Sequence, residues 1–450
     1  MKHFSPAFGE GKIHLGETQK EISGFGGIAP FVHWLKEVGF EEAVRRWQPV
    51  KVSSPNAIDP AGLMLTFIAG NLLGCRHFSH YMHLRWDALL LRMLGLKQAP
   101  TDDTVMNYFR KFTMENITPC FRGLFRWELE KGGDSADVLD LDSTILERCG
   151  SQEGSLKGYN PRRKGRPSHH PLVAFLANRL CFANLWLRGG NAGAANNASQ
   201  FLIETLENIP VKISLVRADS GFMCDHFLNT LEERTLPYIV VARATATVKN
   251  KALALTEWSK VPGSSFECSQ FQHKAKGWNR SRRIVVLRLP QNKEGKKAAG
   301  HQFPESQGWT YRFYCVSDGI KASQAWQMYK GRANIENHIG EIKSDLAMGG
   351  FCLDDFYATE AALRAIAIAH NLLALFQRDC GHLHQRPATI RDSLFRCGAV
   401  LARCGRGFKL LLPQSWGGLK RFKSLMQQLL NWAKSTSPKL GHEHFLEEAQ

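Results

Sequence analysis

Four residues of one short stretch, Tyr329, Arg332, Glu336 and Lys343, combine a phenol, a guanidinium, a carboxylate and an ammonium in the pattern Y-x2-R-x3-E-x6-K. An α-helix turns by about 100° per residue, so a regular helix places the four side chains within about 60° of one another on one face. Such a row suits a phosphate-rich ligand with a metal ion beside it. The alternative is a solvated helix face with ordinary i,i+3 and i,i+4 pairs.

Two more carboxylates lie in the stretch 138–144, which alternates as a strand does. The alternation places Asp140 and Asp142 on one face and leucines on the other. Burying two carboxylates among apolar residues is costly without a cation, so a metal site is expected here. An edge strand with its acidic face in water is the alternative.

Asp219 ends a second apolar stretch, 213–218, and precedes a glycine turn. It is either a metal ligand at the end of a buried strand or the cap of a helix that begins near Asp225. Together with Asp142 and Glu336 it gives three carboxylates on three separate elements. Three converging carboxylates can hold two Mg2+ ions about 4 Å apart, one activating water or a 3′-hydroxyl and the other stabilising the leaving oxygen. That is phosphodiester chemistry.

Two basic segments could bring nucleic acid to such a site. A loop with two prolines and glycine hinges carries Arg162, Arg163, Lys164 and Arg166 and would attract a phosphate backbone, unless it is simply a solvated surface loop. Further on, basic residues surround Trp278, a pattern that suits unstacked nucleic acid. An ordinary hairpin with a packed tryptophan is the alternative there.

The elements that must position these residues fall into five regions. They are a mostly helical N-terminal region, 1–130, the first part of an α/β core, 131–243, a β-rich insertion, 244–310, the second part of the core, 311–380, and a basic C-terminal helical region, 381–450. A DNA-reading helix-turn-helix unit and a plain helical bundle both fit the first region.

Composition narrows the class of protein. The chain has 58 Lys and Arg against 41 Asp and Glu, a net charge of +17, which points to a polyanionic partner and first to nucleic acid. Its eleven cysteines include no C-x2-C pair and predict neither a disulfide framework nor a zinc ribbon. The apolar runs 171–187 and 361–376 are short and interrupted by charge, so we expect no membrane association and a cytoplasmic location. The sequence contains no G-x4-G-K-[ST] loop, so we expect no nucleotide cofactor.

These residues resemble those of DDE transposases of bacterial insertion sequences that carry the Y-R-E-K signature (transposase DDE domain group 1). The matching pieces are Leu141-Asp142-Ser-Thr144, Arg217-Ala-Asp219-Ser-Gly221-Phe222 and the signature itself; Gly158-Tyr-Asn-Pro and Pro167-Ser-His-His-Pro171 are also similar to this group. The resemblance covers roughly residues 130–380.

The resemblance implies an RNase H-like catalytic core with an antiparallel β insertion before the glutamate helix. Asp142, Asp219 and Glu336 would be the catalytic triad and the ligands of two Mg2+ ions, for which Mn2+ can substitute. Tyr329 and its signature partners Arg332 and Lys343 would contact phosphates of the DNA. Asp140 is the alternative first ligand, although the Ser-Thr that follows favours Asp142.

The implied activity is cut-and-paste transposition: hydrolytic nicking, strand transfer by the freed 3′-hydroxyl, and often a hairpin at the excised end. The substrates would be terminal inverted repeats and target DNA, bound by a homodimer in a synaptic complex at the bacterial nucleoid. Trp278 would stabilise a flipped base. Glu341 lies about 140° around the helix from Glu336 and should point elsewhere. Another nuclease or recombinase on this fold, and an inactive DNA-binding descendant, are the rival functions.

Overall fold

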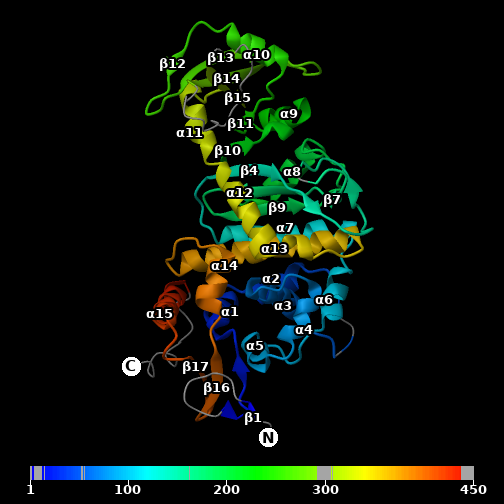
Figure 1. Cartoon of the computed structure of the whole chain (residues 1–450), viewed down its shortest axis with the longest axis vertical. Coiled ribbons are helices and arrows are strands. Elements are labelled where there is room, and N and C mark those ends of the chain that lie inside the picture. The colour runs from blue at the N-terminus through cyan, green and yellow to red at the C-terminus, as the bar shows by residue number, and fades with distance from the viewer. Residues whose placement is uncertain are drawn as a thin grey trace.

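A nine-stranded mixed sheet runs through the upper half of the protein, and helices form the lower half (Figure 1). This computed structural model describes residues 3–4, 13–14, 16–51, 54, 56–161, 163–290, 306 and 308–436. The strand order is β12-β13-β14-β15-β11-β10-β4-β8-β9. The chain is therefore a mixed α/β protein, as the sequence predicts.

Five strands make the half of this sheet nearest the large helices. They are β4 (Asp137–Ser143), β8 (Leu172–Leu176), β9 (Cys181–Trp186), β10 (Ile213–Ala218) and β11 (Tyr238–Val241). Strands β4, β10 and β11 are parallel, whereas β8 runs antiparallel to β4 and β9 antiparallel to β8. Every residue of β8 is buried, which explains its uninterrupted apolar sequence. The two buried strands predicted over 172–188 are confirmed.

Four antiparallel strands extend the same sheet beyond β11. They are β15 (Trp309–Val316), β14 (Arg282–Pro290), β13 (Glu267–His273) and β12 (Ser259–Lys260), and α10 (Ala246–Leu253) precedes them in the chain. Strand β15 returns beside β11, so these strands continue the sheet and do not form a separate one. A second apolar cluster, which includes Val285 and Tyr314, lies on one face of this part.

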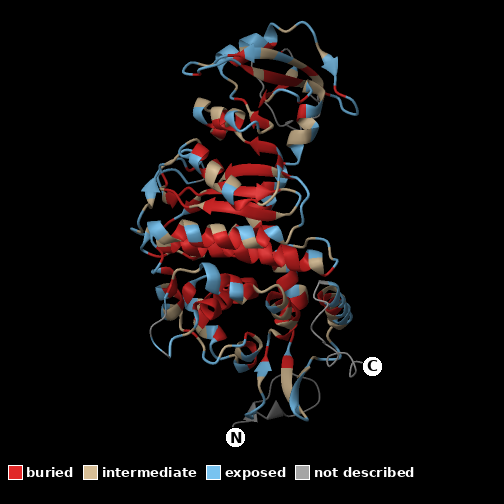
Figure 2. Cartoon of the chain, turned by 180° about the vertical axis from the view of Figure 1, so that it is seen from behind, coloured by how far each residue is buried: buried red, intermediate tan, exposed pale blue. Residues whose placement is uncertain are grey.

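Long helices pack against the β4–β8–β9 end of the sheet. α7 (Met114–Glu130) and α13 (Phe356–Asp379) both contact β9, while α8 (Ala198–Asn208) and α9 (Asp225–Glu233) follow β9 and β10 in the chain. α13 is long and apolar enough to cross a membrane, yet its apolar window is completely buried inside the protein, as Figure 2 shows. It is the core helix that joins the sheet to the helices below.

The N-terminal helices continue the same hydrophobic core, because α3 packs directly on α13. These helices are α1 (Ala29–Glu37), α2 (Phe40–Trp47), α3 (Pro60–Leu73), α4 (Tyr81–Leu84), α5 (Ala88–Met93) and α6 (Asp102–Phe109). Every residue of α3 is buried. A helix with no solvated face needs neighbours on all sides, and here α2, α6 and α13 supply them.

Two expectations of purely helical ends are wrong. In the N-terminal region β1 (His3–Phe4) pairs with β2 (Ile13–His14), and β3 (Ile22–Ser23) pairs with β16 (Ala399–Cys404). In the C-terminal region β16 also forms a hairpin with β17 (Gly407–Leu411), before α15 (Leu419–Thr436). Gly405 has φ +55° in the hairpin turn, a conformation that favours glycine and reverses the chain. Helix periodicity alone missed this sheet because its strands pair across almost the whole length of the chain.

Short elements complete the fold. They are β5 (Leu146–Glu147), β6 (Leu156–Lys157), β7 (Pro167–His169), α11 (Ala325–Lys330), α12 (Ala333–Gly340), α14 (Pro387–Ile390), the 3-10 turns η1 (Gly26–Ile28), η2 (Phe78–His80), η3 (Ser220–Phe222), η5 (Ala322–Gln324) and η7 (Met348–Gly350), and the π-helical turns η6 (Glu341–Asp345) and η8 (Arg391–Phe395).

The stretch from Tyr329 to Lys343 is not one regular α-helix, and that expectation is corrected. α11 ends at Lys330, α12 begins at Ala333, and the last turn is π-helical. Between the helices the Arg332 amide donates to the Tyr329 carbonyl at 2.9 Å, the tighter i→i−3 bond of a 3-10 turn. Because both irregularities change the helical rotation, an ideal 100° wheel does not describe where these side chains point.

Asn371 joins α13 to the edge of the sheet. Its amide group forms a backbone-like pair with Phe182 of β9, accepting from the Phe182 N–H at 2.7 Å and donating to the Phe182 carbonyl at 2.8 Å. It also donates to buried Glu128 of α7 at 2.9 Å. One fully buried side chain thus satisfies polar groups on two other elements.

We predict that Asn371→Leu lowers the free energy of unfolding by about 2–4 kcal/mol, because it leaves the Phe182 backbone groups and Glu128 buried without this partner. Urea denaturation followed by circular dichroism measures the change. The same substitution at exposed Asn250 of α10 is the control and should change stability by less than about 0.5 kcal/mol. Equal effects at the two positions would contradict the bonding role of Asn371.

Candidate active site

Asp142 lies at the end of β4, and its side chain turns into a polar junction between the sheet and α12. Its carboxylate accepts the Ser143 N–H at 2.7 Å, and the Arg332 Nη2 atom lies 3.0 Å away. The residue is only 8% exposed. Burial raises the pKa of Asp142 to about 6, although the Arg332 charge opposes the shift.

Asp219 follows β10 directly, and β10 is the parallel neighbour of β4. The carboxyl ends of parallel strands meet at one edge of a sheet, so Asp219 and Asp142 belong to the same edge. The negative charge of Asp219 raises the pKa of Asp142, which reflects this proximity. Asp219 also accepts the Gly221 N–H at 2.8 Å and caps η3; the N-cap of α9 is Cys224 instead.

Glu336 reaches the same junction from α12. The guanidinium of Arg332 lies 3.7 Å from the Glu336 carboxylate and 3.0 Å from that of Asp142, so one cation bridges the first and third carboxylates. The side chain of Glu336 is 69% exposed, and its charge also raises the pKa of Asp142. The structure therefore brings all three predicted acidic residues into one partly open junction.

The residues of this junction fit a hard divalent cation. Asp142, Asp219 and Glu336 offer carboxylate oxygens, the ligands that Mg2+ prefers. Arg332 supplies one positive charge against three negative ones, and the raised pKa of Asp142 reflects the unbalanced remainder. The Arg332 Nε atom is buried and has no hydrogen-bond partner, so its guanidinium is not fully engaged.

Asp140 has a different task. Arg217, its partner across the β4–β10 pairing, binds it with two hydrogen bonds of 2.6 and 2.8 Å, and both side chains are buried. Arg217 also donates to the Met328 carbonyl of α11 at 2.8 Å. A Cβ on Gly331 would lie only 2.7 Å from this guanidinium, so the glycine lets the chain cross it. Asp140 thus anchors α11 to the sheet, which leaves Asp142 to face the junction.

Tyr329 and Lys343 border the junction through contacts within the protein. The ring of Tyr329 packs at 5.0 Å from that of Tyr314 on β15, and burial raises the pKa of its phenol. The Lys343 ammonium donates to the Thr144 hydroxyl at 2.9 Å and to the Ile145 carbonyl at 2.8 Å. Lys343 therefore fixes the chain just beyond β4, two residues from Asp142.

The basic loop is held by the small sheet β5-β7-β6. Arg162 lies outside the described residues. The Arg163 guanidinium is 3.4 Å from Glu147, whereas Lys164 and Arg166 are exposed. The loop connects to the acidic junction through His170, which sequence reasoning did not select.

His170 lies beneath the junction. Its Nε2 atom is 3.1 Å from the hydroxyl of Ser143, the neighbour of Asp142, and its Nδ1 atom is 2.7 Å from the Ala192 carbonyl. Burial lowers the pKa of His170, against the pull of Asp219. Only the Pro167-Ser-His-His-Pro171 stretch could have indicated it in the sequence.

Trp278 corrects an expectation. It is only 9% exposed, with Arg282 over its ring at 4.8 Å and His273 against its edge. Arg282 is in turn paired with Asp225 and Glu232 of α9. The basic run therefore surrounds a packed tryptophan, not an exposed platform for a base, because the cation–π contact and the ion pairs hold the ring inside the fold.

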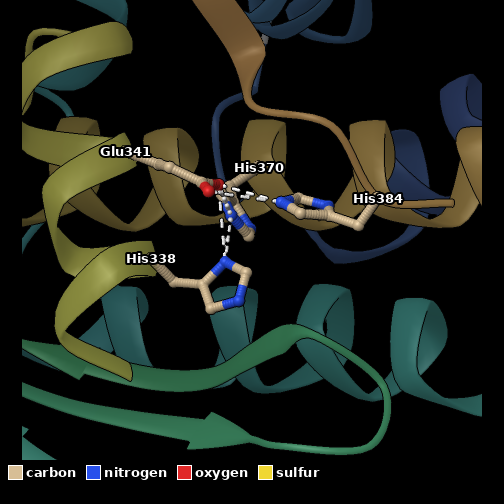
Figure 3. A group of neighbouring side chains, drawn as sticks. All are labelled: His338, Glu341, His370 and His384. Atoms are coloured by element: carbon tan, nitrogen blue, oxygen red, sulfur yellow. Dashed lines mark hydrogen bonds and ion pairs between the residues drawn. The ribbon is translucent and has the colours of Figure 1, made fainter. Parts of the chain in front are cut away.

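Glu341 faces away from Glu336, as expected. It lies among three histidines, His338, His370 and His384, that the sequence analysis did not connect (Figure 3). These histidines come from α12, α13 and the segment after α13. No short motif links residues so widely spaced.

The family model "Transposase DDE domain group 1" matches residues 29–434, nearly the whole described chain. The chain belongs to this family. A search of curated proteins finds no match for this transposase sequence. Seven chains of solved structures match it, among them a cryo-EM structure of a piggyBac transposase synaptic complex with hairpin DNA. That match has a TM-score of 0.42 and 10% identity over 94% of this chain and 87% of the other.

We predict a pH dependence of stability that arises from Asp142 of the transposase. Its folded pKa of about 6 lies above the ordinary 3.8, so the folded state binds the proton more tightly than the unfolded state. The Asp142 contribution is present at low pH and is lost as pH rises from about 4 to 6, by up to about 3 kcal/mol. Urea denaturation without divalent metal should show this decline in the parent but not in Asp142→Asn.

The informative quantity is the difference in unfolding free energy between Asp142→Asn and the parent, which should grow with pH across this window. A constant difference would contradict the raised pKa. Adding Mg2+ should reduce the difference at neutral pH if the carboxylate helps to bind the ion.

Proposed function

We propose that this transposase cleaves and joins DNA at the inverted repeats of a bacterial insertion sequence, in a cut-and-paste reaction that depends on Mg2+. The observation that carries the proposal is the meeting of Asp142, Asp219 and Glu336 around one guanidinium at the carboxyl edge of β4 and β10. Three carboxylates at an open edge of a basic protein suit metal-assisted phosphodiester chemistry.

The catalytic core is proposed to be RNase H-like. The strand order β9-β8-β4-β10-β11, with β4, β10 and β11 parallel and β8 and β9 antiparallel, supports that fold. The core divides into 131–243 and 311–380, with the β-rich insertion 244–310 between them. The flanking regions 1–130 and 381–450 would help to bind DNA.

Asp142, Asp219 and Glu336 would hold two Mg2+ ions, which supply activation of a water or 3′-hydroxyl and stabilisation of the leaving oxygen. Asp142 loses its proton on meeting the cation, and its neighbour Ser143 N–H keeps the carboxylate oriented. Lys343 holds the chain after β4 in place, and Asp140 with Arg217 fixes the helix pair beside it. These contacts keep the ligands in position while DNA binds.

The DNA would reach the junction along the basic loop, whose Lys164 and Arg166 are free to meet phosphates. Arg332 lies between two of the carboxylates, where it can pass from them to a phosphate when cations arrive. Tyr329 borders the same path. We propose that two copies of the chain act together in a synaptic complex on the two transposon ends and the target.

The first test is cleavage, with Mg2+, of a labelled duplex carrying the inverted repeats that flank the coding sequence. The parent should nick at the repeat boundary, and Glu336→Gln should lose at least about 10²-fold in rate, because it removes a metal ligand but no phosphate contact. Asp142→Asn and Asp219→Asn should behave alike. DNA binding by all three, measured by fluorescence anisotropy, should remain.

Asn337→Ala, at an exposed neighbour on α12, is the control and should cleave as the parent does. If Glu336→Gln nicked as fast as the parent, the triad would be wrong. Preference for branched DNA over the repeats would favour another nuclease, and binding without cleavage by the parent would favour an inactive descendant.

A second test addresses the basic loop. Each of Lys164→Ala and Arg166→Ala should weaken DNA binding and reduce the slope of log affinity against log salt by about 1, since each removes one phosphate contact. Fluorescence anisotropy at several salt concentrations measures the slope. Lys321→Ala, at an exposed position before η5, is the control; an unchanged slope in the loop variants would exclude the loop from the DNA path.

A further inference from the structure

A second group of potential metal ligands lies in the protein interior, apart from the carboxylate junction. His338, Glu341, His370 and His384 point their side chains toward one centre (Figure 3). One ligand atom from each lies within 4.8 Å of all the others. The first three residues are at most 4% exposed, and the His384 side chain is 17% exposed.

The spacing of these atoms is that of ligands around one small cation. The Glu341 Oε2 atom lies 3.4, 3.0 and 3.1 Å from nitrogens of His338, His370 and His384, respectively. The His338 Nδ1 and His370 Nε2 atoms are 3.3 Å apart. Ligands about 2.0–2.1 Å from a tetrahedral zinc ion are separated by roughly 3.3–3.4 Å from one another. The observed separations require only small shifts to reach that geometry.

Hydrogen bonds alone explain the group less well. A hydrogen bond joins two atoms, but three imidazoles converge here on one carboxylate oxygen, and two of them also approach each other. All ion pairs of Glu341 in the described part of the chain are with these imidazoles. His370 is neutral at physiological pH, because burial lowers its pKa to about 4. Glu341 stays ionised, since the three imidazoles hold its pKa far below the ordinary value.

The arrangement is thus a buried carboxylate faced by neutral nitrogens, the protonation states that bind a metal. We propose that His338, Glu341, His370 and His384 form a structural site for a divalent transition metal, with zinc as the best match. Imidazole nitrogens with one carboxylate suit zinc, and four protein ligands fill a tetrahedral shell and leave no position for a substrate. This site is distinct from the Asp142, Asp219 and Glu336 junction in ligands and in role.

The ligands come from three segments. His338 and Glu341 lie on α12 and the π-helical turn η6, His370 on α13, and His384 on the chain after α13. π-helical turns within α-helices often mark functional sites, and this one begins at a ligand. The metal would therefore fasten the helix that carries Glu336 to the core helix of the protein.

Metal content tests the site directly. Parent protein expressed in zinc-supplemented medium and dialysed against metal-free buffer should retain about one zinc per chain by elemental analysis. His384→Ala should lose zinc affinity by at least about 10²-fold, because it removes one of four ligands. His384 is the least buried ligand, so this change is the least disruptive to folding.

His382→Ala is the matched control, since it removes a nearby histidine outside the group, and should retain zinc. Glu336→Gln should also retain it, which separates this site from the catalytic carboxylates; the inference thus stands even if the proposed function fails. The metal-stripped parent, but not His384→Ala, should melt at a higher temperature when ZnCl2 is added, and CoCl2 should give the visible absorption of tetrahedral cobalt. A parent that takes up no zinc, or that loses it equally in His382→Ala, would overturn the proposal.

Discussion

Like-charge repulsion at the carboxyl edge of β4 and β10 is the constraint around which this transposase is arranged. Asp142, Asp219 and Glu336 are brought together by three elements, and a single guanidinium, that of Arg332, lies between two of them. Such an arrangement is stable only if the elements are held by other means. Asp140 with Arg217 holds α11 against the sheet, Lys343 holds the chain after β4, and α13 supports both from below.

Much of this edge could be predicted from the sequence because the carboxylates follow local patterns. Alternation over 138–144 places Asp142, and the end of an apolar strand places Asp219. Glu336 follows from its spacing to Arg332. The roles within the edge could not be predicted in the same way: which of Asp140 and Asp142 faces the junction depends on Arg217, a residue that lies across a strand pairing 77 positions away.

What the sequence missed is long-range or irregular. His170 contacts the site only because β7 brings it beside β4, and the histidines around Glu341 come together only when α13 packs on α12. The 3-10 and π-helical turns invalidate an ideal helical wheel, yet no residue type signals them. Trp278 was misjudged because basic neighbours look alike in sequence whether they surround DNA or, as here, bond to α9 through Arg282.

The bond between Asn371 and Phe182 also has a consequence for assembly. The amide of Asn371 occupies the backbone groups of β9 as a tenth strand would, so this border of the sheet cannot accept a strand from another molecule. The opposite border is β12, which is two residues long and ends in an exposed lysine. Strand exchange is thus discouraged at both borders, and two copies that meet on DNA must recognise each other through helices and loops.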